Sequence, residues 1–155
     1  MKKIKFLLAI FLISAVATAQ VVNFSGTWKL NSSKSKLNAE FSMAPNELIL
    51  TQKDNDLDVE RHSSFQGQDF TTNAKFTLDG KECINPGWQD TQTKSTAVWS
   101  DDKKSLKITI KFPMNDGSEM ITVAVYKMDG SDLVIESSSS SSFGDMAETM
   151  VFDKQ

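Results

Sequence analysis

The chain has 155 residues with 17 basic and 20 acidic side chains, which gives a formal net charge of −3. This acidic balance disfavours binding to nucleic acid or to anionic membranes, because both carry dense negative charge. A single cysteine, Cys83, and a single histidine, His62, exclude an intramolecular disulfide and a metal site built from several of these residues. We therefore expect no metal and no cofactor, and we assign Cys83 no role.

Residues 1–19 have the order of a bacterial-type secretory signal peptide. Three lysines precede an apolar stretch, Phe6–Val16, and the small residues of Ala17–Ala19 follow it. The apolar stretch is too short to span a bilayer, which favours a cleaved signal over a retained membrane anchor. We therefore predict an exported protein, periplasmic or extracellular, in which residues 20–155 form a single domain.

From Asn23 onward, apolar residues recur mainly at every second position, which is the periodicity of β-strands. Short turns rich in Gly, Asn and Asp separate the apolar runs and are typical of hairpins between antiparallel neighbours. We predict strands at Phe24–Leu30, Glu47–Lys53, Leu57–Phe65, Asp69–Leu78, Lys81–Ile84, Thr91–Ser100, Ser105–Phe112, Glu119–Lys127, Leu133–Ser139 and Met146–Asp153.

The predicted fold class is all-β, a single antiparallel up-and-down barrel of nine or ten strands. An open sandwich is the alternative, and we prefer the barrel because closure removes unpaired strand edges.

Two segments interrupt the strand pattern. The polar stretch Asn31–Asn46 contains Pro45 and is long for a hairpin loop, so we expect it to cover one end of the barrel. The serine run at Ser137–Ser142 is interpreted as a strand end and turn rather than a disordered linker.

The first predicted strand reads Phe-Ser-Gly-Thr-Trp-Lys-Leu over residues 24–30. Its Gly-x-Trp signature resembles the calycin superfamily, which comprises lipocalins, fatty-acid-binding proteins and bacterial lipocalin-like relatives. The segment Thr-Met-Val-Phe-Asp-Lys at 149–154 is similar to the last strand of fatty-acid-binding proteins. The resemblance implies that Gly26 bends the first strand and that Trp28 plugs the floor of a lipocalin-like barrel. It also implies a secreted protein that binds a small hydrophobic or amphipathic molecule.

The sequence departs from fatty-acid-binding proteins at two places. In that family an arginine and a tyrosine, two positions apart on the last strand, hold the ligand carboxylate, whereas the corresponding residues here are Met150 and Phe152. The family's two lid helices fall between the first two strands, where Asn31–Asn46 has little helical pattern. The resemblance therefore implies neither this carboxylate clamp nor a helical lid in this chain.

Arg61, the only arginine, shares a strand face with Leu57, Val59 and Phe65, whereas His62 lies on the opposite, polar face. If the apolar face lines the interior, Arg61 points inward and could anchor an anionic headgroup. The alternative places Arg61 near the barrel mouth, with its guanidinium in solvent.

Several strand faces mix aromatic, small and hydroxyl-bearing residues, as the wall of a partly hollow barrel would. A solid core that uses small residues to fit the barrel's taper explains the same pattern. For a hollow barrel, the candidate ligand-binding residues are Arg61, Phe70, Phe76, Trp99 and Tyr126.

Catalytic motifs are sparse. A Ser-His-acid triad would have to use His62 on its polar face, and no Gly-x-Ser-x-Gly turn occurs. We therefore expect a non-enzymatic binding protein. One alternative is a filled barrel that contacts another protein through Glu119–Lys127, which is apolar on both faces. Another is an enzyme that uses a carboxylate pair in the barrel mouth.

Overall fold

The computed structural model describes residues 20–39, 42–65, 67–88 and 90–155; the predicted signal peptide lies outside these ranges. Within them the chain forms ten strands and no helix, which confirms the predicted fold class. None of the described residues belongs to a helix that is long and apolar enough to cross a membrane. The strands are β1 (Gly26–Leu30), β2 (Glu47–Lys53), β3 (Asp56–Phe65), β4 (Gln68–Thr77), β5 (Cys83–Pro86), β6 (Gln92–Trp99), β7 (Ser105–Pro113), β8 (Glu119–Asp129), β9 (Asp132–Ser141) and β10 (Gly144–Lys154).

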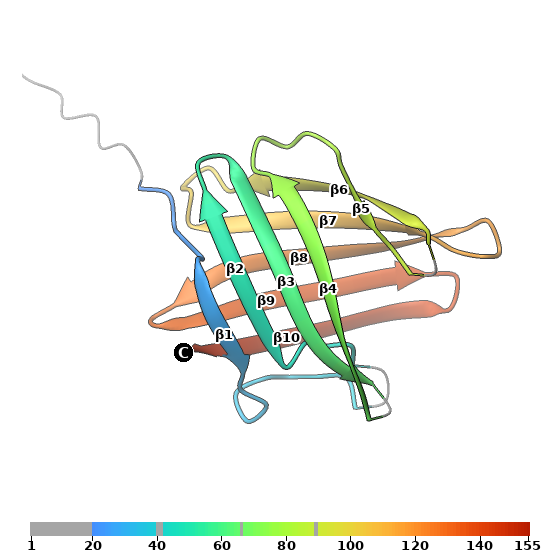
Figure 1. The fold of residues 1–155 in the computed structure, drawn as a ribbon, viewed down its shortest axis with the longest axis horizontal. Helices are drawn as coiled ribbons and strands as arrows, with labels where there is room; N and C mark the ends of the chain where they lie inside the picture. Colours follow the sequence, from blue (N-terminus) through green and yellow to red (C-terminus); the bar gives the residue numbers. More distant parts are fainter. Residues whose placement is uncertain (1–19, 40–41, 66, 89) are drawn as a thin grey trace, which may run out of the picture.

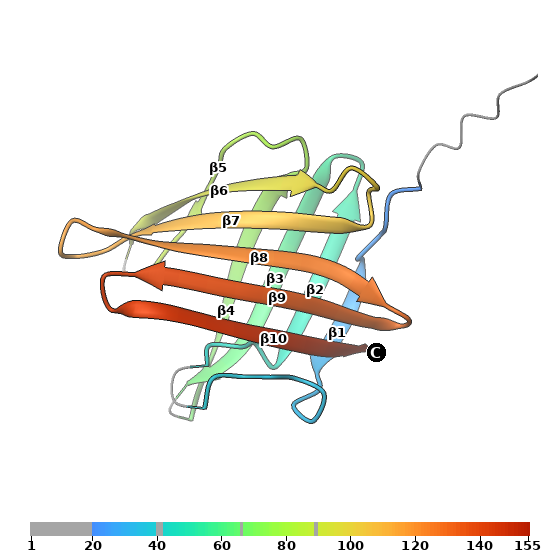
Figure 2. The ribbon, with the colours of Figure 1, turned by 180° about the vertical axis from the view of Figure 1, so that it is seen from behind.

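All neighbouring strands are antiparallel, in the order β4-β3-β2-β1-β10-β9-β8-β7-β6-β5. The first and last strands pair with each other, with Trp28 opposite Lys154 and Leu30 opposite Phe152. Figures 1 and 2 show that β1–β4 form one wall, which crosses over a second wall made by β6–β10. The sheet is therefore an up-and-down barrel, and its two edges are β4 and β5.

Side chains, not a backbone ladder, join these two edges. The backbone N–H of Lys75 on β4 donates to Asn85 Oδ1 at 2.7 Å, and Asn85 Nδ2 donates to the Lys75 carbonyl at 3.0 Å. Next to this pair, the Thr77 N–H donates to Cys83 Sγ at 3.2 Å. The primary amide of Asn85 carries the same donor and acceptor as a peptide group, so it replaces one rung of a β-ladder. We call these contacts the seam.

Side chains of β6 form hydrogen bonds to the seam residue Asn85. Asn85 is buried, and its Nδ2 also donates to Ser95 Oγ at 3.2 Å, while Thr93 Oγ1 donates to the Asn85 carbonyl at 3.3 Å. These contacts fix the orientation of the amide. Sequence periodicity gave Asn85 and Cys83 no role, whereas the structure places both at the closure of the barrel.

The long segment Asn31–Asn46 runs along β10, and its described residues contain no helix. Lys36 and Thr149 exchange two backbone hydrogen bonds, of 2.7 and 2.9 Å, and the Asn38 N–H donates to a carboxylate oxygen of Glu148 at 2.8 Å. The serine run extends β9 to Ser141 and enters the hairpin to β10, which confirms its interpretation as strand and turn.

Trp28 lies in the buried core, and its role as the floor of the barrel stays a prediction. Its side chain is 1% exposed, its Nε1 donates to the Phe24 carbonyl at 2.9 Å, and the Lys154 ammonium lies 5.4 Å from the ring centre. Gly26, two residues earlier, has a φ of 148°, a conformation that favours glycine. A Cβ at this position would lie 3.1 Å from Lys154 Cε. A side chain at this position would therefore have to displace the end of the Lys154 side chain.

Replacing Trp28 with alanine should lower the free energy of unfolding by about 3–5 kcal/mol, because it removes a buried aromatic side chain and leaves a cavity. Trp88→Ala is the matched control, since Trp88 is 72% exposed and should change stability little. Chemical denaturation followed by circular dichroism measures both variants. Equal effects of the two substitutions would contradict the assignment of Trp28 to the core.

Asn85→Ala should lower the free energy of unfolding by about 1–3 kcal/mol, because the Lys75 peptide groups lose their partners at the seam. The exposed Asn73→Ala, on the adjoining strand β4, is the control for loss of an asparagine amide. Hydrogen exchange adds a local test. The Lys75 amide should exchange faster in Asn85→Ala than in the wild type, and unchanged protection would show that the amide does not close the seam.

Candidate functional site

The barrel interior has a filled end and an accessible end. Along the inward face of β8, Tyr126 and Ala124 are buried, whereas Thr122 and Met120 are only half-buried. Along β9, Leu133 is buried and Ser137, on the same face, is half-buried. Inward side chains thus become accessible toward the β7–β8 and β9–β10 hairpins. Solvent therefore reaches the interior from the end of the barrel that carries these hairpins.

On the opposite wall, inward side chains also change from buried to accessible along the strands. On β4 the inward face runs from buried Phe76 to exposed Thr72, and on β3 it runs from buried Val59 to half-buried Arg61. We call the accessible region the open half and the filled region the closed end. Residues that line the open half include Arg61, Phe70, Thr72, Met120, Thr122 and Ser137.

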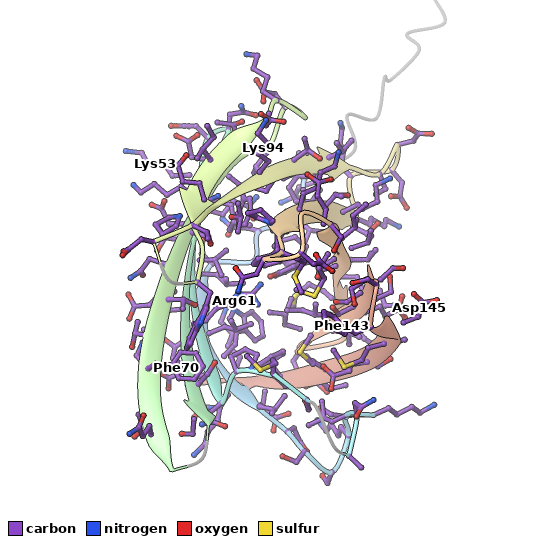
Figure 3. All side chains as sticks on the ribbon, turned by 90° about the vertical axis from the view of Figure 1, so that its right-hand side faces the viewer. Lys53, Arg61, Phe70, Lys94, Phe143 and Asp145 are labelled. Carbon is purple, nitrogen blue, oxygen red and sulfur yellow. The ribbon has the colours of Figure 1, made fainter. Side chains whose placement is uncertain are left out.

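Arg61 projects from β3 toward the facing wall. Its Nη2 donates to the hydroxyl oxygen of Tyr126 on β8 at 3.1 Å, although the two residues are 65 positions apart in the chain. Figure 3, which looks onto the side of the molecule at the right of Figure 1, shows Arg61 and Phe70 on the inner side of the β3–β4 wall, with Phe143 and Asp145 on the opposite wall. The predicted inward orientation of Arg61 is confirmed.

Arg61 has no acidic partner among the described residues: every ion pair that these residues form uses another cation. Glu60, its neighbour on the strand, bonds to His62 on the outer face, with 2.6 Å between Oε1 and Nε2. Glu148 shares the inward face of β10 with Met150, and its carboxylate accepts the Asn38 N–H. The guanidinium therefore carries a positive charge into the barrel, and no carboxylate of the described residues forms an ion pair with it.

The other predicted ligand contacts fall in two regions. Phe70 lies in the open half, beside a shallow hollow that also includes His62, Ser63 and Asp69. Tyr126 is fully buried at the boundary between the open half and the closed end.

Phe76 and Trp99 lie in the closed end. Phe76 is 2% exposed, and Trp99 stacks on Phe24 with 5.7 Å between ring centres. The structure therefore gives these two residues a packing role, and their contact with a ligand stays a prediction. They do not border the open half because their strand positions lie near the opposite end of the barrel from Phe70 and Thr122.

Periodicity alone missed the contact between Arg61 and Tyr126 and the inward hydroxyl groups of β9. Strands β3 and β8 are not neighbours in the sheet, so no alternation pattern joins Arg61 to Tyr126. On β9, the strand parity of Leu133 and Ile135 could have identified Ser137 and Ser139 as inward. Ser139 Oγ lies 2.8 Å from Thr122 Oγ1 across the β8–β9 pair.

The structure also contains the outward apolar face of β8 that the sequence predicted. Ile121 is 39% exposed, and with Val123 it borders a shallow groove that continues over Ser138 on β9 and Ala147 on β10. Contact with another protein through this face stays a prediction. Among the described residues, no group of three His, Cys, Asp or Glu side chains is arranged to hold a metal ion.

Neither models of protein families nor curated protein sequences match this chain. Solved structures do match its fold. Fatty-acid-binding protein 1 of Echinococcus granulosus aligns with a TM-score of 0.59 and 18% identity, over 84% of this chain and 96% of that one. The zebrafish ileal bile acid-binding protein, in complex with cholic acid, aligns with a TM-score of 0.57 and 17% identity, over 85% and 98% of the two chains.

The lipid binding protein 8 of Caenorhabditis elegans aligns with a TM-score of 0.57 and 11% identity, over 85% of this chain and 95% of that one. These alignments span nearly the whole of each solved chain at low identity. The solved proteins therefore share their fold with this protein. The chain has the same barrel fold as these lipid-binding proteins, as the Gly-x-Trp resemblance predicted.

Proposed function

We propose that the protein is an exported, non-enzymatic carrier that binds a small apolar or amphipathic molecule in the open half. One observation carries the proposal: inward side chains that would be buried in a filled barrel remain accessible there, Thr122 and Ser137 among them. Ligand sites of proteins are concave, mostly apolar regions with a few polar groups that orient the ligand. The open half likewise combines apolar side chains, such as Phe70 and Met120, with polar groups.

The lining of the open half suits an amphipathic ligand. Met120 and Met146 supply flexible apolar surface that adapts to different shapes, while Ser137, Ser139 and Thr122 supply hydroxyl groups. The closed end supplies a rigid base, because its large side chains are fully buried and hold the strands in register. The names of the solved neighbours, which include fatty-acid-binding and bile acid-binding proteins, are in line with a ligand of this class.

A carrier function agrees with the chemistry of the acidic side chains. Hydrogen bonds from Lys81 lower the pKa of Asp79 to about 2, and the Ser100 hydroxyl lowers the pKa of Asp102. The Ser118 hydroxyl likewise lowers the pKa of Asp116. A general acid needs a pKa raised toward the working pH, so these turn carboxylates are poor candidates for acid catalysis. His62 is also unsuited to a triad, because its ring nitrogens face Glu60 and Glu47.

Export belongs to the proposal through the predicted signal peptide at residues 1–19. A carrier outside the cytoplasm meets its ligand in the periplasm or the medium. Mass spectrometry of the protein purified from its own periplasmic or extracellular fraction tests both parts, since it reports the new N-terminus near residue 20 and any co-purified small molecule. A protein recovered with its first residues intact would contradict cleavage.

Ser137→Phe should block ligand binding, because it places a large ring in the open half. Ser138→Phe, one residue later, points to the outer face of the same strand and serves as the matched control. We expect an environment-sensitive apolar dye to bind the wild type and Ser138→Phe alike, and Ser137→Phe at least tenfold more weakly. Fluorescence titration of the three proteins, each checked for folding by circular dichroism, makes the comparison.

The same pair of variants separates a hollow from a filled interior. In a hollow barrel Ser137→Phe is accommodated, whereas overpacking a filled core costs about 1–3 kcal/mol of stability. A large loss of stability, together with no dye binding by the wild type, would favour the filled barrel that contacts another protein through Glu119–Lys127.

A further inference from the structure

We propose that Arg61 and Tyr126 form an anion clamp at the base of the open half, and that the carried ligand is an amphiphile with an anionic headgroup. The inference rests on the proposed carrier function and names the part of the ligand that the protein recognises. It follows from the hydrogen-bonding groups of Arg61 and Tyr126, only some of which are used in the contact between these two side chains.

The Arg61–Tyr126 contact leaves donors without acceptors. The Tyr126 oxygen accepts the Arg61 N–H, so its own hydroxyl hydrogen needs a separate acceptor, and it makes no further hydrogen bond to the described residues. Tyr126 is 0% exposed, and a buried donor without an acceptor is unfavourable. A guanidinium has five N–H donors, of which one is used here. Two side chains from opposite walls therefore present only donors at one point.

A carboxylate, or another compact anion, completes this arrangement. It accepts from the Tyr126 hydroxyl and from the planar fork of Arg61 together, and hydrogen bonds that involve charged partners are the stronger ones. It also balances a cation that has no acidic partner among the described residues and that is costly to desolvate alone. Glu148, the inward carboxylate on β10, is already bonded to the Asn38 N–H.

The position of the clamp sets the direction of the ligand. In the barrel wall, Tyr126 lies between Leu106 and Ile135, which are both buried in the closed end. The headgroup therefore rests on the dry core, and the apolar part extends through the open half toward Phe70 and Met120. Met150 and Phe152, at the positions of the last-strand carboxylate clamp, are buried apolar residues. In this chain the anion site lies on β3 and β8.

Two matched dyes test the clamp. 1-Anilinonaphthalene-8-sulfonate and N-phenyl-1-naphthylamine share one aromatic skeleton, but only the first carries an anionic group. Arg61→Met should weaken sulfonate-dye binding by about ten- to a hundredfold, and Tyr126→Phe, which removes a hydroxyl alone, by about three- to tenfold. Binding of the uncharged dye should change less than twofold in both variants. Titrations followed by dye fluorescence give the six affinities, two for the wild type and two for each variant.

Lys53→Met is the control for net charge, because Lys53 is an exposed cation on the outside of the same wall, as Figure 3 shows. It should bind both dyes as the wild type does. Thermal unfolding followed by circular dichroism tests a structural role of Arg61, because such a role would lower the melting temperature of the variant. Arg61→Met should melt at or above the wild-type temperature, since it removes a cation without an ion pair, and Arg61→Lys covers the case in which the methionine variant does not fold.

The outcomes distinguish failure of the anion clamp from failure of the carrier function. Selective loss of the anionic dye supports the clamp. Equal loss of both dyes, or no loss of either, would overturn it and leave the carrier function intact. A wild-type protein that binds the uncharged dye but not the sulfonate would overturn the clamp as well. If the wild type binds neither dye, the carrier function fails together with the clamp.

Discussion

The antiparallel pairing of β1 with β10 is the contact on which the barrel depends. It joins the wall of β1–β4 to the wall of β6–β10, and the seam joins the two edges of the sheet, β4 and β5. The register of the pairing runs from Trp28 opposite Lys154 to Leu30 opposite Phe152. Trp28 then fills the space enclosed by the joined walls, with its indole N–H satisfied by the Phe24 carbonyl. The tryptophan of the Gly-x-Trp signature thus belongs both to this pairing and to the core.

The division of the interior into a closed end and an open half follows from residue size on the inward faces. Leucine, isoleucine and aromatic side chains fill the closed end, whereas serine, threonine and alanine predominate on β8 and β9 beyond Tyr126. Short side chains fill less of the interior of a barrel whose diameter is set by its strands. Arg61 lies at this boundary, where apolar neighbours and solvent are both within reach. A wholly buried position would make the charge of Arg61 too costly to desolvate.

Much of the fold could be predicted from the sequence, because strand periodicity and turn residues are local signals. The alternation of Leu57, Val59 and Arg61 also predicted the inward guanidinium. Contacts across the barrel could not be predicted in this way. The Arg61–Tyr126 bond joins strands that are not neighbours, and the distribution of Phe76 and Trp99 into the closed end depends on the height of each residue along the barrel axis. Parity tells which face a residue occupies and gives no information on that height.

The seam has a consequence for aggregation. Backbone ladders form with almost any sequence, whereas closure at β4 and β5 depends on the particular chemistry of Asn85. Unpaired strand edges are templates on which other chains add strands. In this barrel the Asn85 amide occupies the backbone groups of Lys75 on the edge strand β4, and Cys83 Sγ accepts the Thr77 N–H. Two side chains therefore protect this part of the β4 edge from the addition of another strand.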